Sequence, residues 1–143
     1  MLAGRPAAYE APAIHLDTVV APPAHCTVLA GNGVSEIQAA EIRSGAGSLW
    51  GVQYHPEFGL DELAAILERR VEILLNEGFC ATREDAASYV ADLRAMHRDP
   101  QRRDLAWRHG LDGEVLDAVR RTREIRNFVE MRVKPVASER SRA

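Results

Sequence analysis

The chain has 143 residues, of which 46% are hydrophobic, and this composition can supply the core of a single folded domain. Its formal net charge of −3 gives no electrostatic reason to expect a nucleic acid or an anionic membrane surface as a partner. The sequence has neither an apolar run of about 18 residues nor a charged-then-apolar N-terminal region, so a transmembrane helix and a secretory signal are not predicted.

The first half of the chain has the pattern of short strands. After an irregular lead-in over residues 1–8, residues 13–20 alternate between a largely apolar set and a set that includes His15 and Asp17, until two prolines end the pattern. An Asn-Gly pair at Asn32 predicts a turn further along. No crossover helix is predicted here, so we expect an edge portion of a sheet. The remaining strands are predicted at residues 26–30, 36–43 and 49–54. The last of them overlaps the apolar run at residues 48–52, which is expected to be buried.

From about residue 59 onward the pattern is helical. Apolar residues at spacings of three and four predict one helix, with Gly78 suited to its C-terminal cap. This stripe consists of Leu60, Leu63, Leu67, Val71 and Leu74. The run Thr82-Arg83-Glu84-Asp85 resembles a capping box with Asp in the place of Glu or Gln, and it predicts the start of a second helix. One face of that helix is expected to carry Ala86, Val90, Leu93 and His97.

Two more helices are predicted before the C-terminus. Asp99-Pro100 predicts the start of a short third helix that runs to about His109 and stops at Gly110. Asp112 can cap a fourth helix that runs to about Arg132, because its early acids (Glu114, Asp117) and later bases match the helix dipole. The tail after Pro135 is expected to be disordered. The basic residues of this fourth helix are Arg120, Arg121, Arg123 and Arg126. They are interpreted as a solvated face, with an anion or nucleic-acid site as the alternative.

The octet Gly51-Val52-Gln53-Tyr54-His55-Pro56-Glu57-Phe58 places an imidazole and a carboxylate two residues apart, directly after an apolar run. Residues i and i+2 of an extended segment point to the same side, so His55 and Glu57 are expected to leave the strand together. Pro56 limits how far the segment can bend. A carboxylate beside an imidazole holds one tautomer and stabilises the protonated form, which prepares a general base for a thiol or hydroxyl. A structural role is the alternative.

A second His-x-acid pair, His15 and Asp17, lies upstream of the octet. Together with His55 and Glu57 it offers four imidazole and carboxylate ligands of the kind that bind zinc or non-haem iron. A metal site is therefore an alternative hypothesis for these four residues. The two tryptophans, Trp50 and Trp107, are interpreted as aromatic residues of the core or of an interface.

The octet resembles the His-x-Glu signature of class I glutamine amidotransferases, which use a Cys-His-Glu triad. Three upstream elements are similar to the same family in the same order, most closely to its GMP-synthase-type and stand-alone members: His15-Leu16-Asp17-Thr18-Val19, Val28-Leu29-Ala30-Gly31-Asn32 and Ile37-Gln38-Ala39. The resemblance covers roughly residues 7–75 and implies the C-terminal portion of a flavodoxin-like α/β domain. We therefore expect a partial amidotransferase-like domain over residues 1–78, a helical extension over 79–134 and a tail over 135–143.

The resemblance also implies roles for individual residues. It makes His55 the residue that shuttles the proton, Glu57 the residue that orients His55, and His15 a residue beside the glutamine pocket. The family cysteine lies upstream on a Gly-x-Cys-x-Gly elbow, and no such elbow occurs here. Cys26 and Cys80 lack the flanking glycines of a nucleophile turn, so they are interpreted as reduced, partly buried thiols in a cytoplasmic compartment.

We therefore expect a glutamine amidotransferase-like protein that needs no cofactor and is inactive as this fragment. Its expected partners are glutamine and a missing N-terminal half or partner chain. The first alternative is a non-catalytic regulatory or interaction module on the same scaffold, and another is a gene fragment whose Met1 is an internal methionine. An uncovered sheet edge would in addition favour oligomers or aggregation.

Overall fold

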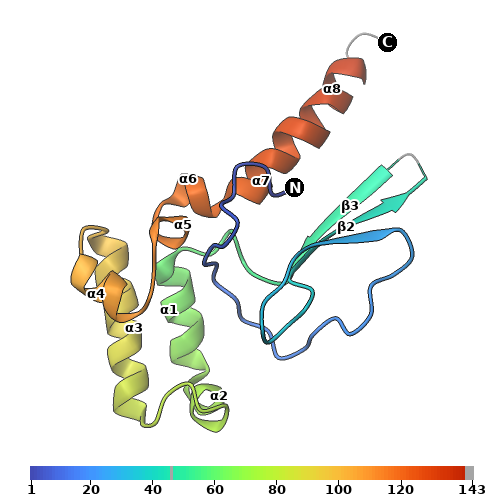
Figure 1. Cartoon of the computed structure of the whole chain (residues 1–143). Coiled ribbons are helices and arrows are strands. Elements are labelled where there is room, and N and C mark those ends of the chain that lie inside the picture. Colours follow the sequence, from blue (N-terminus) through green and yellow to red (C-terminus); the bar gives the residue numbers. More distant parts are fainter. Residues whose placement is uncertain (46, 141–143) are drawn as a thin grey trace. The chain divides into compact units, whose positions relative to one another are not determined.

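The computed structural model describes the backbone of residues 1–45 and 47–140, and the side chains of all of these except residues 139 and 140. The chain is a mixed α/β protein with a small antiparallel sheet in its first half and helices after it (Figure 1). It divides into two compact units: Met1–Pro56 together with Thr122–Ala143 form unit 1, and Glu57–Arg121 form unit 2. The flavodoxin-like fold and the domain boundaries at residues 78 and 134 stay predictions.

The sheet of unit 1 has three strands in the order β1-β2-β3, with both neighbouring pairs antiparallel. Ser44 at the end of β2 pairs with Gly47 at the start of β3, and Gly45 after β2 has a φ of 56°, a value that glycine adopts without strain. The predicted strand at 26–30 is confirmed, whereas the next two are each displaced by two or three residues at their starts. The three strands are β1 Cys26–Ala30, β2 Ala39–Ser44 and β3 Gly47–Val52.

The prediction of a strand over residues 13–20 is wrong. Only Ala13 pairs, as an isolated antiparallel bridge with Tyr54, and the residues after it are irregular. Side-chain hydrogen bonds, described below, hold this segment in place of a ladder, and its apolar members Leu16 and Val20 are exposed. The expected burial of β3 is also wrong, because Leu49 is 60% exposed. One face of an antiparallel sheet can remain in solvent, and here an apolar run does so.

Trp50 on β3 connects the sheet to the C-terminal helical segment of unit 1. Its ring meets Phe128 edge-on, with ring centroids 5.6 Å apart, and the Arg132 guanidinium lies 5.3 Å from its ring centroid. Arg132 also pairs with Glu41 of β2 at 2.9 Å. The interpretation of Trp50 as an interface aromatic is thus confirmed within this unit. Trp107 of unit 2 is 91% exposed and is not a core residue.

Unit 2 begins with three helices, α1 to α3. The predicted first helix is interrupted at Arg70, whose φ of −119° leaves the helical region, and this break separates α1 Leu60–Arg69 from α2 Val71–Asn76. Gly78 ends α2 as predicted, with a φ of 74°. The amide of Gly78 donates to the Leu75 carbonyl at 3.1 Å, and that of Phe79 donates to the Leu74 carbonyl at 2.9 Å, the paired bonds of a Schellman motif.

The third helix, α3 Arg83–Arg98, begins at the predicted capping box. The Thr82 hydroxyl accepts from the Asp85 amide at 3.1 Å, and the Asp85 carboxylate accepts from the Thr82 amide at 3.0 Å. The helix packs against α1, but His97 is exposed and Met96 is buried in its place. The core of this packing is apolar and contains Leu63, Ala64, Leu67, Ala86, Val90, Leu93 and Met96.

The helices after α3 are shorter than predicted. The third predicted helix begins at Arg103 and not at Asp99, and it ends before Gly110, which has the expected positive φ of 64°. Asp112 caps its helix as predicted, since its carboxylate accepts from the Glu114 amide at 2.8 Å. That helix lasts one turn, because the Asp117 carboxylate caps a new one. The elements are α4 Arg103–Arg108, α5 Gly113–Leu116 and α6 Ala118–Arg121.

The C-terminal part of unit 1 is helical as far as residue 140, as α7 Arg123–Phe128, the π-helix η1 Val129–Val133 and α8 Lys134–Arg140. Disorder after Pro135 is therefore wrong up to residue 140, and residues 141–143 lie outside the described residues. Pro135 lacks a backbone N–H, and the wider π-turn before it is one way in which a helix accommodates a missing donor.

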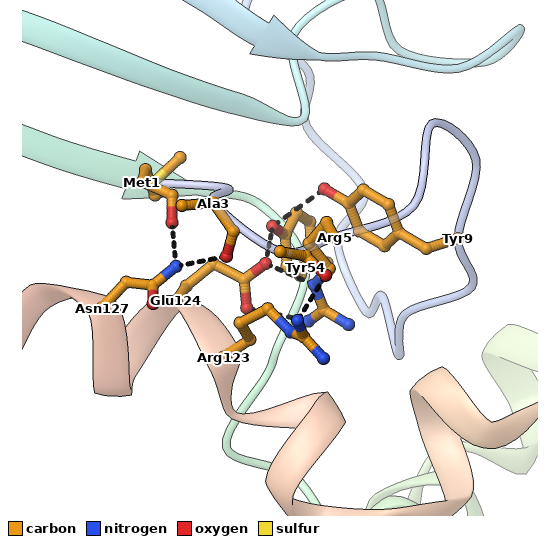
Figure 2. Close-up of polar contacts among 9 residues, drawn as sticks. Met1, Ala3, Arg5, Tyr9, Tyr54, Arg123, Glu124 and Asn127 are labelled. Carbon is orange, nitrogen blue, oxygen red and sulfur yellow. Dashed lines mark hydrogen bonds and ion pairs between the residues drawn. The ribbon is translucent and has the colours of Figure 1, made fainter.

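The four arginines interpreted as a solvated face are only partly exposed. Arg126 and Arg120 are exposed, but Arg121 donates to the Val115 carbonyl at 2.8 Å and Arg123 donates to the Gly4 carbonyl. The N-terminal lead-in is irregular as predicted, yet it is tied down further, because the Asn127 side chain donates to the carbonyls of Met1 and Ala3 (Figure 2).

A buried polar cluster in unit 1 joins residues that are far apart in the sequence (Figure 2). Glu124 of α7 accepts two hydrogen bonds from Arg5, at 2.7 and 2.8 Å, and a third from the Tyr54 hydroxyl at 2.9 Å. The Arg5 and Glu124 side chains are only 2% and 5% exposed. Tyr9 completes the cluster, with its hydroxyl 3.0 Å from that of Tyr54. One carboxylate thus fixes Arg5 and Tyr54 directly and Tyr9 through Tyr54.

We expect Thr82→Ala to lower the free energy of unfolding by about 1 kcal/mol, because the Asp85 amide loses its acceptor at the start of α3. Urea unfolding followed by circular dichroism measures the change. Ser88→Ala, at an exposed position inside the same helix, is the matched control and should have little effect or stabilise slightly. Equal effects of the two substitutions would contradict the capping role.

Burial, followed by the Tyr9 hydrogen bond and the negative charge of Glu124, raises the pKa of Tyr54 above its ordinary value of 10.0. The unfolded chain therefore releases the Tyr54 proton first, and the free energy of unfolding falls as pH rises above about 10. We expect Tyr54→Phe to be less stable than the wild type by roughly 1–3 kcal/mol at pH 7, because Glu124 loses a donor. That difference should narrow above pH 10. If the difference in unfolding free energy between the wild type and Tyr54→Phe stays constant from pH 7 to pH 11, this assignment is contradicted.

Candidate active site

His15 lies in the irregular segment after Ala13, and both of its ring nitrogens have partners. The Nδ1 atom lies 2.8 Å from the backbone carbonyl oxygen of Asp17, and the Nε2 atom lies 3.1 Å from the side-chain amide nitrogen of Gln38. A carbonyl oxygen only accepts and an amide nitrogen only donates, so Nδ1 carries the proton and Nε2 accepts. This arrangement favours the Nδ1–H tautomer of His15.

Gln38 anchors His15 to the sheet. Its backbone amide donates to the Ala30 carbonyl at 2.8 Å, and its carbonyl accepts from the Gln53 amide at 2.9 Å, which continues the β2–β3 pairing beyond the strands. The residue is 7% exposed, and its side-chain oxygen is buried without a hydrogen-bond partner among the described residues. The rigid backbone of Gln38 thus fixes the place at which the His15 ring can bind.

Gln53 anchors the same segment at a second point. Its side-chain oxygen accepts from the Ser35 hydroxyl at 3.0 Å, and its side-chain nitrogen donates to the Asp17 carbonyl at 3.3 Å. Because Ser35 has one proton to give, the Thr18 hydroxyl, 2.7 Å away, donates to Ser35. Two glutamines on neighbouring strand ends therefore hold residues 15–18, and the sheet determines where this segment lies.

The side chains of His15, Thr18, Ser35, Gln38 and Gln53 thus form one polar network, joined through the Asp17 carbonyl. The loop between β1 and β2 supplies Ser35 to this network. Its turn is formed by Asn32, whose side-chain oxygen accepts from the amides of Val34 at 3.0 Å and Ser35 at 2.8 Å. The predicted turn at the Asn-Gly pair is confirmed, although the loop is longer than a two-residue hairpin. A Cβ at Gly31 would collide with the Glu36 carbonyl, so the loop closes only with glycine at that position.

His55 lies just beyond β3, at the end of the pairing that holds the network. Its amide donates to the Pro12 carbonyl at 2.7 Å, and the preceding residue, Tyr54, bridges to Ala13. The side chain is half-buried. Residues 12 and 13, which lead to His15, thus fix the backbone of His55. Backbone contacts therefore connect the segments that carry the two predicted site histidines.

Glu57 does not continue an extended strand, contrary to the expectation from its spacing. β3 ends at Val52, and Pro56 and Glu57 form a turn. Glu57 is exposed and is the first residue of unit 2, whereas His55 belongs to unit 1. The catalytic pairing of His55 with Glu57 therefore stays a prediction.

Both cysteines are free and half-buried. Cys26 is the first residue of β1, and Cys80 lies in the loop between α2 and α3. Neither position is a turn from a strand into a helix, which is the geometry that exposes a nucleophile on such an elbow. The structure therefore gives no reason to assign a catalytic thiolate to Cys26 or Cys80.

Within residues 1–45 and 47–140, no group of three or more His, Cys, Asp or Glu side chains is arranged to hold a metal ion. The metal hypothesis for His15, Asp17, His55 and Glu57 thus finds no cluster there. Among the helices of these residues, none combines the length and the apolar character that crossing a bilayer requires.

The sequence assigns no role to three residues of the network, Ser35, Gln38 and Gln53, although Gln38 and Gln53 lie within the quoted motifs. The available signal was weak: Gln38 is a polar residue inside a predicted strand, where a buried side chain needs a partner. Its partner, however, is 23 residues away in the sequence, and that of Gln53 is 18 residues away. No periodicity or motif reports such a pairing.

The tautomer of His15 can be measured directly. In long-range ¹H–¹⁵N correlation spectra at neutral pH we expect the Nδ1–H form, in contrast to the Nε2–H form that free histidine prefers. Gln38→Ala removes the donor to Nε2 and should reduce that preference, whereas the exposed His97 serves as the internal reference for an unconstrained ring. An Nε2–H tautomer in the wild type would show that the Gln38 amide has the opposite orientation.

The chain is similar to one characterised enzyme. It is 30% identical over 139 residues to a γ-glutamyl-L-1-hydroxyisopropylamide hydrolase from Pseudomonas sp, and the match covers 95% of this chain and 46% of that protein. The chain thus spans about half of the length of this relative. No family model matches the sequence, and no solved structure matches it. The assignment to the GMP-synthase-type amidotransferases stays a prediction.

Proposed function

We propose that this chain is the histidine-bearing part of a glutamine amidotransferase-like hydrolase that cleaves γ-glutamyl amides. The observation that carries the proposal is the octet at residues 51–58, whose histidine follows β3 and whose amide is fixed to the Pro12 carbonyl. The similarity to a hydrolase named for a γ-glutamyl amide supports the same reading. Glutamine is the simplest γ-glutamyl amide, so the resemblance and the relative point to one class of bond.

The reaction would use a cysteine from polypeptide outside these 143 residues. His55 takes the proton of this thiol, the thiolate attacks the γ-carbonyl carbon, and the carbon–nitrogen bond breaks as His55 delivers that proton to the departing amine or ammonia. Water, deprotonated by His55, then attacks the thioester and releases glutamate and the thiolate. Glu57 orients His55 and stabilises its protonated form without exchanging protons itself.

His15 has a different role in this proposal. Both of its ring nitrogens are occupied, by Asp17 and by Gln38, so the ring is not available as a proton carrier. Its contribution is to hold residues 15–18 beside the site, where that segment borders the glutamyl group. Loss of the ring should therefore weaken substrate binding more than it slows the chemical steps.

A non-catalytic module is the second candidate. It is favoured by one observation, the positions of Cys26 and Cys80 away from any nucleophile elbow. In that case the same network would bind a γ-glutamyl compound or a partner chain without turnover.

Reconstitution tests the proposal. The chain is co-expressed with the part of the Pseudomonas hydrolase that it does not match, and glutamate release is followed from glutamine and from a γ-glutamyl anilide. We expect turnover by the complex and none by the chain alone. His55→Ala should lower kcat by about 10⁴-fold or more, because the thiol then lacks its base. Glu57→Ala should leave weaker, measurable activity, and His15→Ala should act mainly on KM.

The matched control is His97→Ala, which removes an exposed histidine of α3 and should leave kcat and KM unchanged. Equal turnover by the wild type and His55→Ala complexes would exclude His55 as the general base. A complex that binds glutamine, as seen by calorimetry, but releases no glutamate would support the non-catalytic module.

A further inference from the structure

The buried cluster around Glu124 is not used by the proposed reaction, yet it contacts the residue next to His55. Figure 2 shows the Glu124 carboxylate bonded to the Arg5 guanidinium and to the Tyr54 hydroxyl, and the hydroxyl of Tyr9 joined to that of Tyr54. Arg5 and Glu124 are 119 residues apart, and Tyr54 and Glu124 are 70 apart. The cluster therefore joins the lead-in, the end of the sheet and α7.

The hydrogen bonds of the cluster have one consistent direction. The carboxylate only accepts, so the single Tyr54 proton is directed to Glu124 and the Tyr54 oxygen accepts from Tyr9. The Arg5 guanidinium binds both carboxylate oxygens and lies 4.7 Å from the centre of the Tyr9 ring. Because these groups are buried, a displaced Tyr54 ring would leave Glu124 with an unpaired site away from water.

The same residue is fixed at its backbone. Tyr54 bridges to Ala13, and the amide of His55 donates to the Pro12 carbonyl. The Tyr54 ring is thus held by α7 at its hydroxyl end, while residues 12 and 13 hold the main chain. Fixing both ends of Tyr54 leaves the Cα of His55 little freedom to move.

We infer that Glu124 is a positioning residue for His55, acting through the Tyr54 hydroxyl. The helical segment from Arg123 onward is then part of the support of the histidine and not an appended surface. The inference rests on the proposed function for its catalytic meaning, but its structural claim concerns the His55 backbone alone. Glu124 itself contacts neither substrate nor the reacting atoms in this proposal.

Hydrogen exchange of backbone amides in the full chain tests the structural claim. In Glu124→Ala we expect the His55 amide to lose protection by about tenfold or more relative to the Arg43 amide, which bonds to the His25 carbonyl in the same unit. Tyr54→Phe keeps the aromatic ring and removes only the hydroxyl, and it should show the same selective loss. Glu130→Ala is the matched control, because it removes an exposed carboxylate of the same helical segment that pairs only with Lys134 among the contacts described.

Activity of the reconstituted complex provides the second readout. Tyr54→Phe and Glu124→Gln should lower kcat with little change in KM, and Glu124→Gln should retain more activity than Glu124→Ala because its amide oxygen can still accept from Tyr54. Equal loss of protection at His55 and Arg43 in both Glu124→Ala and Tyr54→Phe would show a general structural role and overturn the inference. Unchanged protection at His55 would overturn it as well. If the wild-type complex has no turnover, the proposed function fails, while the exchange data still decide the positioning role.

Discussion

A buried ion pair constrains the whole of unit 1. Removing the charges of Arg5 and Glu124 from water has a large desolvation cost, which only close pairing and further hydrogen bonds can offset. Here two bonds from Arg5 and one from Tyr54 supply that compensation. The lead-in, the end of the sheet and α7 can therefore take up their positions only together. This is why a segment without regular secondary structure at the N-terminus is nevertheless fixed.

The polar network at the sheet ends follows the same physical rule with neutral groups. Gln38 and Gln53 extend the β2–β3 pairing, and their side chains hold the segment with His15 through bonds to the ring and to the Asp17 carbonyl. A segment with no ladder of its own thus acquires a defined position. The sheet thus positions His15 through Gln38, and α7 supports His55 through Tyr54. This arrangement links the stability of unit 1 to the geometry proposed for catalysis.

Local signals predicted those features whose partners lie within a few residues. Gly78 ends α2 and Thr82 begins α3 as expected, because caps bond to amides and carbonyls three to five positions away. Periodicity was less decisive. The apolar stripe from Leu60 continues through the break at Arg70, and the alternation over residues 13–20 belongs to no sheet. A repeat indicates which side chains could share a face, but the backbone needs a surface to pack against before it adopts that form.

The sequence by itself determined the chemistry available to this protein: the His55 and Glu57 octet, the absence of a nucleophile elbow within these 143 residues, and the caps that delimit the central helices. Only the tertiary structure decided that Gln38 holds His15, that Tyr54 and Arg5 converge on Glu124, and that α7 belongs with the sheet. The physical reason is the length of the interactions in sequence. A cap is satisfied by its own neighbours, whereas a buried charge or amide takes its partner from whichever distant segment folding brings beside it.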